Sequence, residues 1–132
     1  MGLKTSMKII VINDMGTMRK IIEKMLKTMG FTNITQADDG ATALPMIKEA
    51  TELGVPYEFI VSDWNMPGMS GLDLLKTLRA DDQYKDLPFL MVTAEAEQGN
   101  VVIAVKAGVS NFIVKPFSAA TLQEKIQKIF KA

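Results

Sequence analysis

Polar side chains stand directly after four short apolar runs of this sequence. They are Asn13 and Asp14 after Lys8–Ile12, Asp63 after a run that begins at Phe59, Thr93 after Leu87–Val92, and Lys115 after Phe112–Val114. Short runs rich in branched apolar residues are typical of strands that are buried on both faces. In a parallel sheet with right-handed connections, the carboxyl ends of such strands share one edge, where ligands bind. We therefore expect these polar side chains to face one shallow crevice.

This set of side chains suits phosphoryl transfer assisted by a metal ion. Mg²⁺ prefers hard oxygen ligands and usually takes one or two carboxylates, so Asp14 and Asp63 are candidate ligands. A metal would screen the repulsion between these carboxylates and leave one of them available as a nucleophile toward phosphorus. Lys115 and the hydroxyl of Thr93 would stabilise negative charge on the phosphoryl oxygens. Each residue alone is more often a turn former or a helix cap, so the hypothesis depends on the four positions together.

The composition and the motifs exclude several other kinds of chemistry. None of the 132 residues is Cys or His, so disulfides, thiolate or imidazole metal sites and His-containing triads are impossible within this chain. The 15 Lys and Arg residues balance 15 Asp and Glu residues, and we expect no nucleic-acid partner. The P-loop and dinucleotide-binding motifs are both missing. An aspartyl-phosphate hydrolase would need an acid in place of Asn65, and the acidic loop at 13–15 does not suit a flavin phosphate.

Segments with helical periodicity alternate with the apolar runs, and a weaker run at Ile34–Ala37 completes five strands. The first three expected helices cover Met18–Met29, with a stop at Gly30, about Ala41–Leu53, and a segment after Gly71 with an apolar stripe of Leu72, Leu75 and Leu78. The fourth covers about Gly99–Ala107. The last has an apolar stripe of Leu122, Ile126, Ile129 and Phe130. We expect residues 38–40 to form a turn that starts the second helix, and Pro45 to lie in or near its first turn. The alternation predicts an α/β fold, a doubly wound five-stranded parallel sheet with five helices.

Length and targeting patterns predict how the chain is organised. The absence of a linker predicts one domain over residues 1–132, with 1–7 as an N-terminal extension and no output domain. No apolar run approaches the ~18 residues of a membrane span, and the N-terminus lacks the apolar stretch of a secretory signal. Residues 1–6 fit a short myristoylation pattern, which we interpret as a chance match. We therefore expect a cytoplasmic monomer that binds no membrane.

The polar residues and their flanks resemble the signature of bacterial response-regulator receiver domains. The similar segments are Asn13-Asp14, residues 62–71 (SDWNMPGMSG), Thr93-Ala94-Glu95 and Lys115-Pro116-Phe117, and the resemblance runs from about Met7 to the C-terminus. Residues 17–20, 63–67 and 115–122 are similar in particular to the single-domain chemotaxis members of this family. The resemblance implies a flavodoxin-like fold with strand order 2-1-3-4-5. It also implies a signalling protein rather than an enzyme, which switches protein–protein interactions in chemotaxis and flagellar motility.

The resemblance further implies roles for individual residues. Asp63 would accept a phosphoryl group from a phosphohistidine on a sensor histidine kinase, since this chain has no imidazole of its own. Asp14, Asp63 and the backbone carbonyl of Asn65 would hold Mg²⁺, while Thr93 and Lys115 would contact the phosphoryl group and assist its addition and removal. Phe112 would be the aromatic residue whose rotation is coupled to phosphorylation. The flagellar motor switch protein and a phosphatase are the further partners that the resemblance suggests.

Three departures from the family pattern limit this transfer of roles. Asn13 stands where the family usually has an acid, so its part in metal binding would be at most indirect; we expect weaker Mg²⁺ binding and easier ionisation of Asp63. Phe112 stands where Tyr is typical, and a plain core aromatic is as well supported as a switch. Glu97-Gln98 stand where the chemotaxis pattern is basic.

The apolar helix that follows has two interpretations. Residues 101–105 are apolar nearly all round, which indicates either deep burial or a docking face, and we favour docking. Together with the altered charge at 97–98, this puts the usual motor contact in doubt. A phosphate sink and a phosphorylation-independent interaction module are therefore kept as alternative functions.

Overall fold

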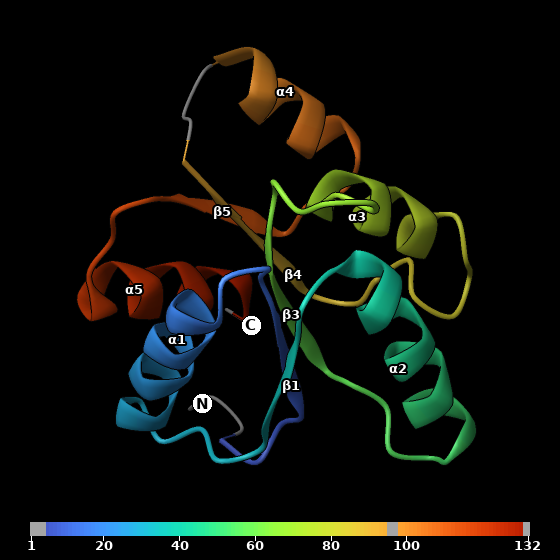
Figure 1. The fold of residues 1–132 in the computed structure, drawn as a ribbon, viewed down its shortest axis with the longest axis horizontal. Helices are drawn as coiled ribbons and strands as arrows, with labels where there is room; N and C mark the ends of the chain where they lie inside the picture. Colours follow the sequence, from blue (N-terminus) through green and yellow to red (C-terminus); the bar gives the residue numbers. More distant parts are fainter. Residues whose placement is uncertain (1–4, 95–97, 131–132) are drawn as a thin grey trace.

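The computed structural model describes residues 5–94 and 98–130, and within these residues five strands alternate with five helices (Figure 1). The strands are β1 (Ile9–Ile12), β2 (Ile34–Ala37), β3 (Phe59–Asp63), β4 (Phe89–Thr93) and β5 (Asn111–Val114). The helices are α1 (Gly16–Thr28), α2 (Gly40–Glu52), α3 (Gly71–Arg79), α4 (Gln98–Lys106) and α5 (Ala119–Ile129). All strand pairs are parallel, in the order β2-β1-β3-β4-β5. The predicted fold class and strand order are confirmed.

Helices cover both faces of the sheet, because alternate strand residues are apolar on both sides. Ile9 and Val11 pack with residues of α1 and α5, whereas Ile10 and Ile12 pack with residues of α2 and α3. Figure 1 shows the same two layers, with α1 and α5 on one side of the strands and α2 and α3 on the other. Every residue of β1, β3 and β4 is buried. Burial of each large aliphatic side chain contributes about 1.5–3 kcal/mol to the stability of the fold. The buried sheet therefore holds the residues at its edge in fixed positions.

The register brings the carboxyl ends of the central strands to one level. Ile12 pairs with Ser62, so Asn13 and Asp63 occupy equivalent positions on neighbouring strands. Asp63 pairs with Val92, and Thr93 pairs with Val114, directly before Lys115. The predicted grouping of polar residues at one sheet edge therefore follows from the strand pairing.

Pro45 lies near the start of its helix. The helix α2 begins at Gly40, and the side chain of Asp39 caps it by accepting a hydrogen bond from the Thr42 N–H at 2.8 Å. Pro45 is the sixth residue of this helix and therefore lies in its second turn. Its missing N–H leaves the Ala41 carbonyl without a helical donor, but both residues are exposed, so water can satisfy that carbonyl.

The apolar stripe of α3 also differs from the predicted one. Leu74, Leu75 and Leu78 are fully buried, while Leu72 is only half-buried. Together with Gly71, the buried residues follow the i, i+3, i+4, i+7 spacing of a helix face. The prediction placed Leu72 in the buried stripe in place of Leu74, because four leucines within seven residues fit two overlapping helix faces.

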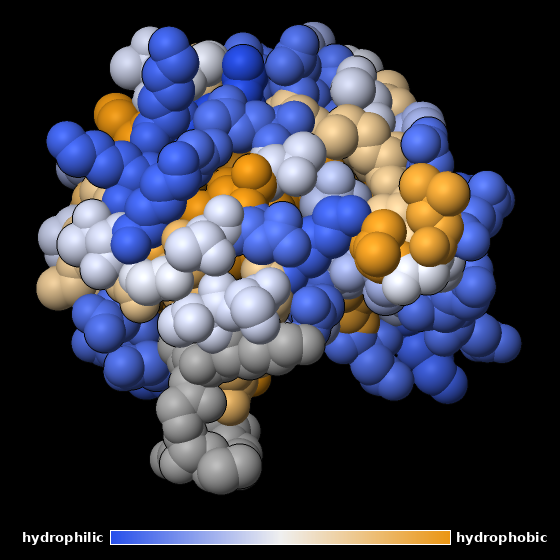
Figure 2. All heavy atoms as spheres, turned by 90° about the horizontal axis from the view of Figure 1, so that it is seen from below, coloured by the Kyte–Doolittle hydropathy of each residue, from blue (hydrophilic) through white to orange (hydrophobic). Residues whose placement is uncertain are grey.

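Exposed apolar side chains are concentrated on α4 and at the end of α2. On α4, Val102, Ile103 and Val105 are exposed and only Ala104 is buried among residues 101–106, which excludes deep burial of this helix. Leu53 and Val55 are exposed beyond α2. Seen from below (Figure 2), the surface is mostly hydrophilic with separate apolar spots. No helix in the described part of the chain has the length and hydropathy to cross a bilayer.

Candidate functional site

Asp63 occupies the centre of the strand-end site. It is the last residue of β3 and only 5% exposed, and its Oδ1 lies 2.9 Å from Nζ of Lys115. The backbone of Lys115 is itself fixed, because its N–H donates to the carbonyl of Thr93 at 2.8 Å. Thr93, at the end of β4, is also 5% exposed. Three of the residues predicted from the sequence are thus brought together from three strands.

Burial has the largest influence on the carboxyl of Asp63 and raises its pKa above the ordinary value for aspartate. The negative charge of Asp14 acts in the same direction. A hydrogen bond and the positive charge from Lys115, and then the backbone N–H of Trp64, lower the pKa without reversing the shift. The site therefore contains a carboxylate that has lost most of its water, a state that costs free energy in the absence of a ligand.

Asp14 and Asn65 line a cavity of about 330 Å³ together with Met66, Pro67 and Ser70. Asp14 is close enough to Asp63 for its charge to act on that carboxyl. Asp14 is exposed, so its carboxylate is open to a metal ion. Two carboxylates and the backbone carbonyl of Asn65 fit the ligand set that Mg²⁺ takes when it keeps several waters. Within residues 5–94 and 98–130, no group of three or more acidic side chains is gathered, so a cage built only from protein carboxylates does not form. The site fits magnesium and is open to solvent.

Asn13 is oriented differently from a metal ligand. Its side chain is fully buried, and its Oδ1 accepts a hydrogen bond from the Met15 N–H at 2.8 Å. The only oxygen that the amide could offer a metal is therefore already engaged with the backbone. An indirect role in metal binding at most stays a prediction.

Replacing Asn13 by Asp is expected to tighten Mg²⁺ binding about tenfold. The carboxylate would keep one oxygen on the Met15 N–H and add a second oxygen with a negative charge close to Asp14 and Asp63. Titration of Trp64 fluorescence with Mg²⁺ measures the dissociation constant. An unchanged constant in Asn13→Asp would contradict the expectation, and Asn33→Asp, which changes an exposed amide distant from the site, is the control.

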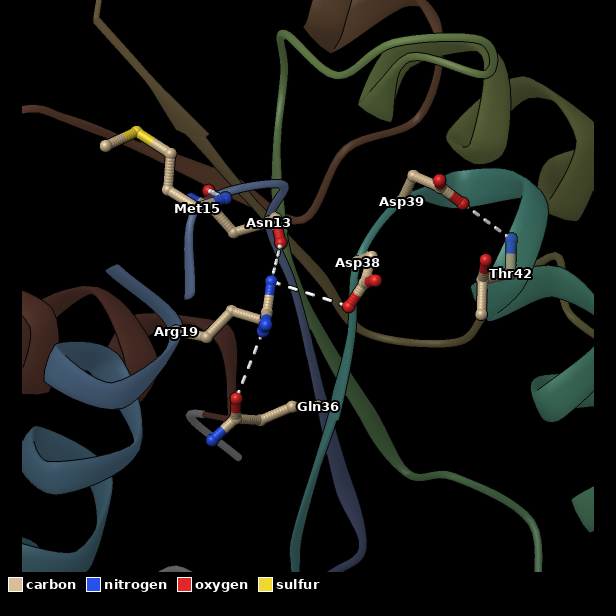
Figure 3. A network of polar contacts seen from close by, with 7 residues as sticks. All are labelled: Asn13, Met15, Arg19, Gln36, Asp38, Asp39 and Thr42. Atoms are coloured by element: carbon tan, nitrogen blue, oxygen red, sulfur yellow. Dashed lines mark hydrogen bonds and ion pairs between the residues drawn. The ribbon is translucent and has the colours of Figure 1, made fainter. Parts of the chain in front are cut away.

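Arg19 holds the loop that joins β1 to α1, a role that was not predicted from the sequence. Its Nη1 donates to the backbone carbonyl of Asn13 at 2.7 Å, and its Nε donates to Oε1 of Gln36 at 3.1 Å. A looser ion pair joins it to Asp38 at 3.6 Å. Figure 3 shows the guanidinium between these three partners, which come from β2 and the loops after β1 and β2. The resemblance had included residues 17–20, but only the tertiary contacts reveal why an arginine occupies position 19.

Replacing Arg19 by Lys is expected to lower the free energy of unfolding by about 1 kcal/mol. The bonds to Asn13 and Gln36 start from two different nitrogens of the guanidinium, and the single nitrogen of an ammonium cannot occupy both positions. Urea unfolding followed by circular dichroism measures the change. Lys20→Arg, a change at the exposed neighbour, serves as the control and should alter stability by less than about 0.5 kcal/mol. Equal effects of the two changes would contradict the role assigned to Arg19.

Phe112 lies between a core position and a surface position. It is half-buried and packs against the cluster of α2 and α3, while Nζ of Lys125 lies 5.2 Å from the centre of its ring. Neither the switch nor the plain core interpretation is tested by this geometry. Glu95 and Glu97 lie outside the described residues, as does the side chain of Gln98.

Gly71 allows the loop after β3 to fold back onto the site. Its N–H donates to the carbonyl of Trp64 at 2.9 Å, and a Cβ at this position would lie 2.1 Å from the carbonyl oxygen of Asp63. A capping box between Ser70 and Asp73 then starts α3. The close approach of these backbones fixes residues 64–70, including Asn65, next to Asp63.

Comparison with known proteins agrees with this arrangement. A family model described as the response regulator receiver domain matches residues 9–127. The chain belongs to this family. The resemblance inferred from the sequence motifs is thereby confirmed.

Similar receiver proteins are known from chemotaxis. The chain is 52% identical over 129 residues to chemotaxis protein CheY-3 of Vibrio cholerae serotype O1. The aligned residues are 98% of this chain and 95% of that relative. It is 52% identical over 125 residues to chemotaxis protein CheY of Pseudomonas aeruginosa, covering 95% and 97%. The crystal structure of Vibrio cholerae CheY4 at low pH superposes with a TM-score of 0.84 at 30% identity, over 95% of this chain and 99% of that one. The similarity thus extends over nearly the whole length of this chain and of the two chemotaxis relatives.

Proposed function

We propose that this receiver domain is a two-component response regulator of the CheY type that accepts a phosphoryl group on Asp63 and acts in chemotaxis. The observation that supports the proposal best is the pairing of a nearly buried Asp63 with Lys115 at 2.9 Å, beside Thr93 and Asp14. An acidic nucleophile, a cation and a hydroxyl around one point suit a transferring phosphoryl group. The donor would be a phosphohistidine of a sensor kinase.

Asp63, Lys115 and Thr93 each have a role in the proposed transfer of the phosphoryl group. A carboxylate oxygen of Asp63 forms a bond to phosphorus while the P–N bond of the donor breaks, and the released imidazole takes a proton from solvent. Lys115 moves from pairing with the carboxylate to pairing with a phosphoryl oxygen, and the hydroxyl of Thr93 donates to another. Bound Mg²⁺, held by Asp14, Asp63 and the carbonyl of Asn65, would neutralise negative charge between the carboxylates and the phosphoryl group. The same residues would assist hydrolysis of the acyl phosphate.

Phosphorylation would act on partners by shifting an equilibrium between two packings. Charge added at Asp63 draws Thr93 and Lys115 toward it, and Phe112, three residues before Lys115 on β5, is the aromatic group placed to respond. A partner that prefers the shifted packing would then bind more tightly. The exposed apolar residues of α4 are the surface best suited to such docking.

Mass spectrometry with a small phosphoryl donor tests phosphoacceptance directly. The protein with Mg²⁺ is expected to gain one phosphate-sized adduct on the peptide containing Asp63, and Trp64 fluorescence is expected to change when beryllofluoride is added. Asp63→Asn should abolish both results, while Asp82→Asn, a change at an exposed acid, should leave them intact. A missing adduct under donor excess would contradict the proposed function.

Binding to the motor switch protein separates the chemotaxis proposal from its two alternatives. A motor regulator is expected to bind more tightly with beryllofluoride than without it. A phosphate sink would take up phosphate without binding, and a phosphorylation-independent module would bind equally in both conditions. The exposed face of α4 is the observation that favours the first outcome.

A further inference from the structure

The side chain of Asn13 is the one described polar side chain that is fully buried and lacks a hydrogen-bond partner at one of its atoms. Its Nδ2 donates to nothing, although the residue is 0% exposed. The other polar groups of Asn13 are all engaged: the backbone N–H with Ala37, the backbone carbonyl with Arg19, and Oδ1 with the Met15 N–H. Buried donors without partners are rare because each has lost its hydration without replacement.

Exchanging the positions of Oδ1 and Nδ2 by a flip of the amide does not give Nδ2 a hydrogen-bond partner. A flipped side chain would point Nδ2 at the Met15 N–H, setting two donors against each other at the 2.8 Å that Oδ1 now spans. Arg19 also restrains the residue through its carbonyl at 2.7 Å. The geometry therefore presents a fixed, dehydrated donor at the end of β1, level with Asp63 on β3.

A water bound to Mg²⁺ and a phosphoryl group are the two groups that could face this amide, and they differ in whether they accept its hydrogen bond. A water bound to Mg²⁺ has its lone pair directed at the metal, so it donates hydrogen bonds and needs an acceptor such as a carboxylate. A phosphoryl group on Asp63 brings three strong acceptor oxygens. The Nδ2 of Asn13 matches the second kind and not the first.

We infer that Asn13 donates a hydrogen bond from Nδ2 to a phosphoryl oxygen on Asp63, and so acts as a phosphoryl-binding residue rather than as a weakened metal ligand. The inference rests on the proposed function. An aspartate could not take this role, because a carboxylate at position 13 would place an acceptor and a negative charge next to the incoming anion.

Opposite effects on the two ligands test this inference. In Asn13→Asp, the affinity for Mg²⁺ alone rises about tenfold, whereas the affinity for beryllofluoride at saturating Mg²⁺ falls about tenfold, which corresponds to 1.4 kcal/mol. Trp64 fluorescence reports both titrations. Tighter binding of both ligands would overturn the inference, since it would show that Asn13 is only a deficient acid. The substitution is nearly isosteric and keeps the acceptor for the Met15 N–H, and circular dichroism of the variant checks that it is folded.

The side-chain amide signals of Asn13 in a ¹H–¹⁵N correlation spectrum give a direct measurement on the unmodified protein. With Mg²⁺ and beryllofluoride, one Nδ2 proton is expected to move downfield, while Mg²⁺ alone leaves it in place; the exposed amide of Asn33 is the internal control. If Trp64 responds to beryllofluoride but the Asn13 amide does not, the inference fails and the proposed function stands. If neither responds, phosphoacceptance itself fails, and the inference with it.

Discussion

Replacing Asp63 by Asn is expected to raise the free energy of unfolding by about 1–2 kcal/mol while abolishing phosphoryl uptake. The carboxyl is nearly buried, and burial is the first cause of its raised pKa, ahead of the opposing influence of Lys115. An amide of the same shape removes the cost of holding a charge there. Lys115 is 21% exposed at its side chain and can turn toward water once its partner is neutral.

The dependence of stability on pH provides a second signature of the same residue. Because the pKa of Asp63 is higher in the folded state than in the unfolded state, the folded protein keeps a proton that the unfolded chain has already lost. The contribution of this group to stability therefore falls as pH rises from the unfolded pKa, about 3.9, through the folded pKa, and is constant above it. In Asp63→Asn, this decrease is absent.

Chemical denaturation of both proteins across pH 3.5 to 8 measures the predicted difference, with Asp82→Asn as the exposed control. The stability curves should diverge as pH rises and run parallel near neutrality. A variant that is less stable than the parent at pH 7 would show that the ion pair with Lys115 outweighs the cost of burial. The same variant, tested with a phosphoryl donor, should give no adduct.

Replacing Gly71 by Ala is expected to destabilise the protein by about 2–3 kcal/mol and to weaken Mg²⁺ binding. The added Cβ would lie 2.1 Å from the carbonyl oxygen of Asp63 and 2.9 Å from the sulfur of Met91. The sulfur is on a flexible side chain, but the carbonyl belongs to the last residue of a buried strand. Either the start of α3 or the end of β3 must move, and residues 64–70 with the carbonyl of Asn65 would move as well.

The matched control is Gly16→Ala, since Gly16 is also the first residue of its helix. A Cβ there would meet only the guanidinium of Arg19, at 3.3 Å, which is the far end of a long side chain. Its effect on stability should be less than about 1 kcal/mol. Thermal unfolding and the Mg²⁺ titration of Trp64 fluorescence measure both variants, and equal effects would show that the approach of Gly71 to Asp63 is less tight than the structure indicates.

The sequence alone was sufficient for the architecture, because the signals for it are local. Short apolar runs marked the strands, and residues at helical spacing marked the helices between them. Residues 38–40 were predicted to form a turn that starts the second helix, and α2 begins at Gly40. The error at Leu72 arose where a local pattern fits two registers, and tertiary packing decides between such registers.

The sequence also determined which residues would share the sheet edge, since Asp63, Thr93 and Lys115 each follow a strand and parallel strands end together. Only the tertiary structure decided what state those residues are in. The raised pKa of Asp63 depends on burial and on Lys115, which lies 52 residues further along the chain. The bonds that Asn13 makes with Met15 and Arg19 join residues close in sequence, but the burial that leaves its Nδ2 without a partner depends on how the strands pack. Burial and hydrogen bonding are fixed by three-dimensional neighbours, and a one-dimensional pattern does not specify the distances between them.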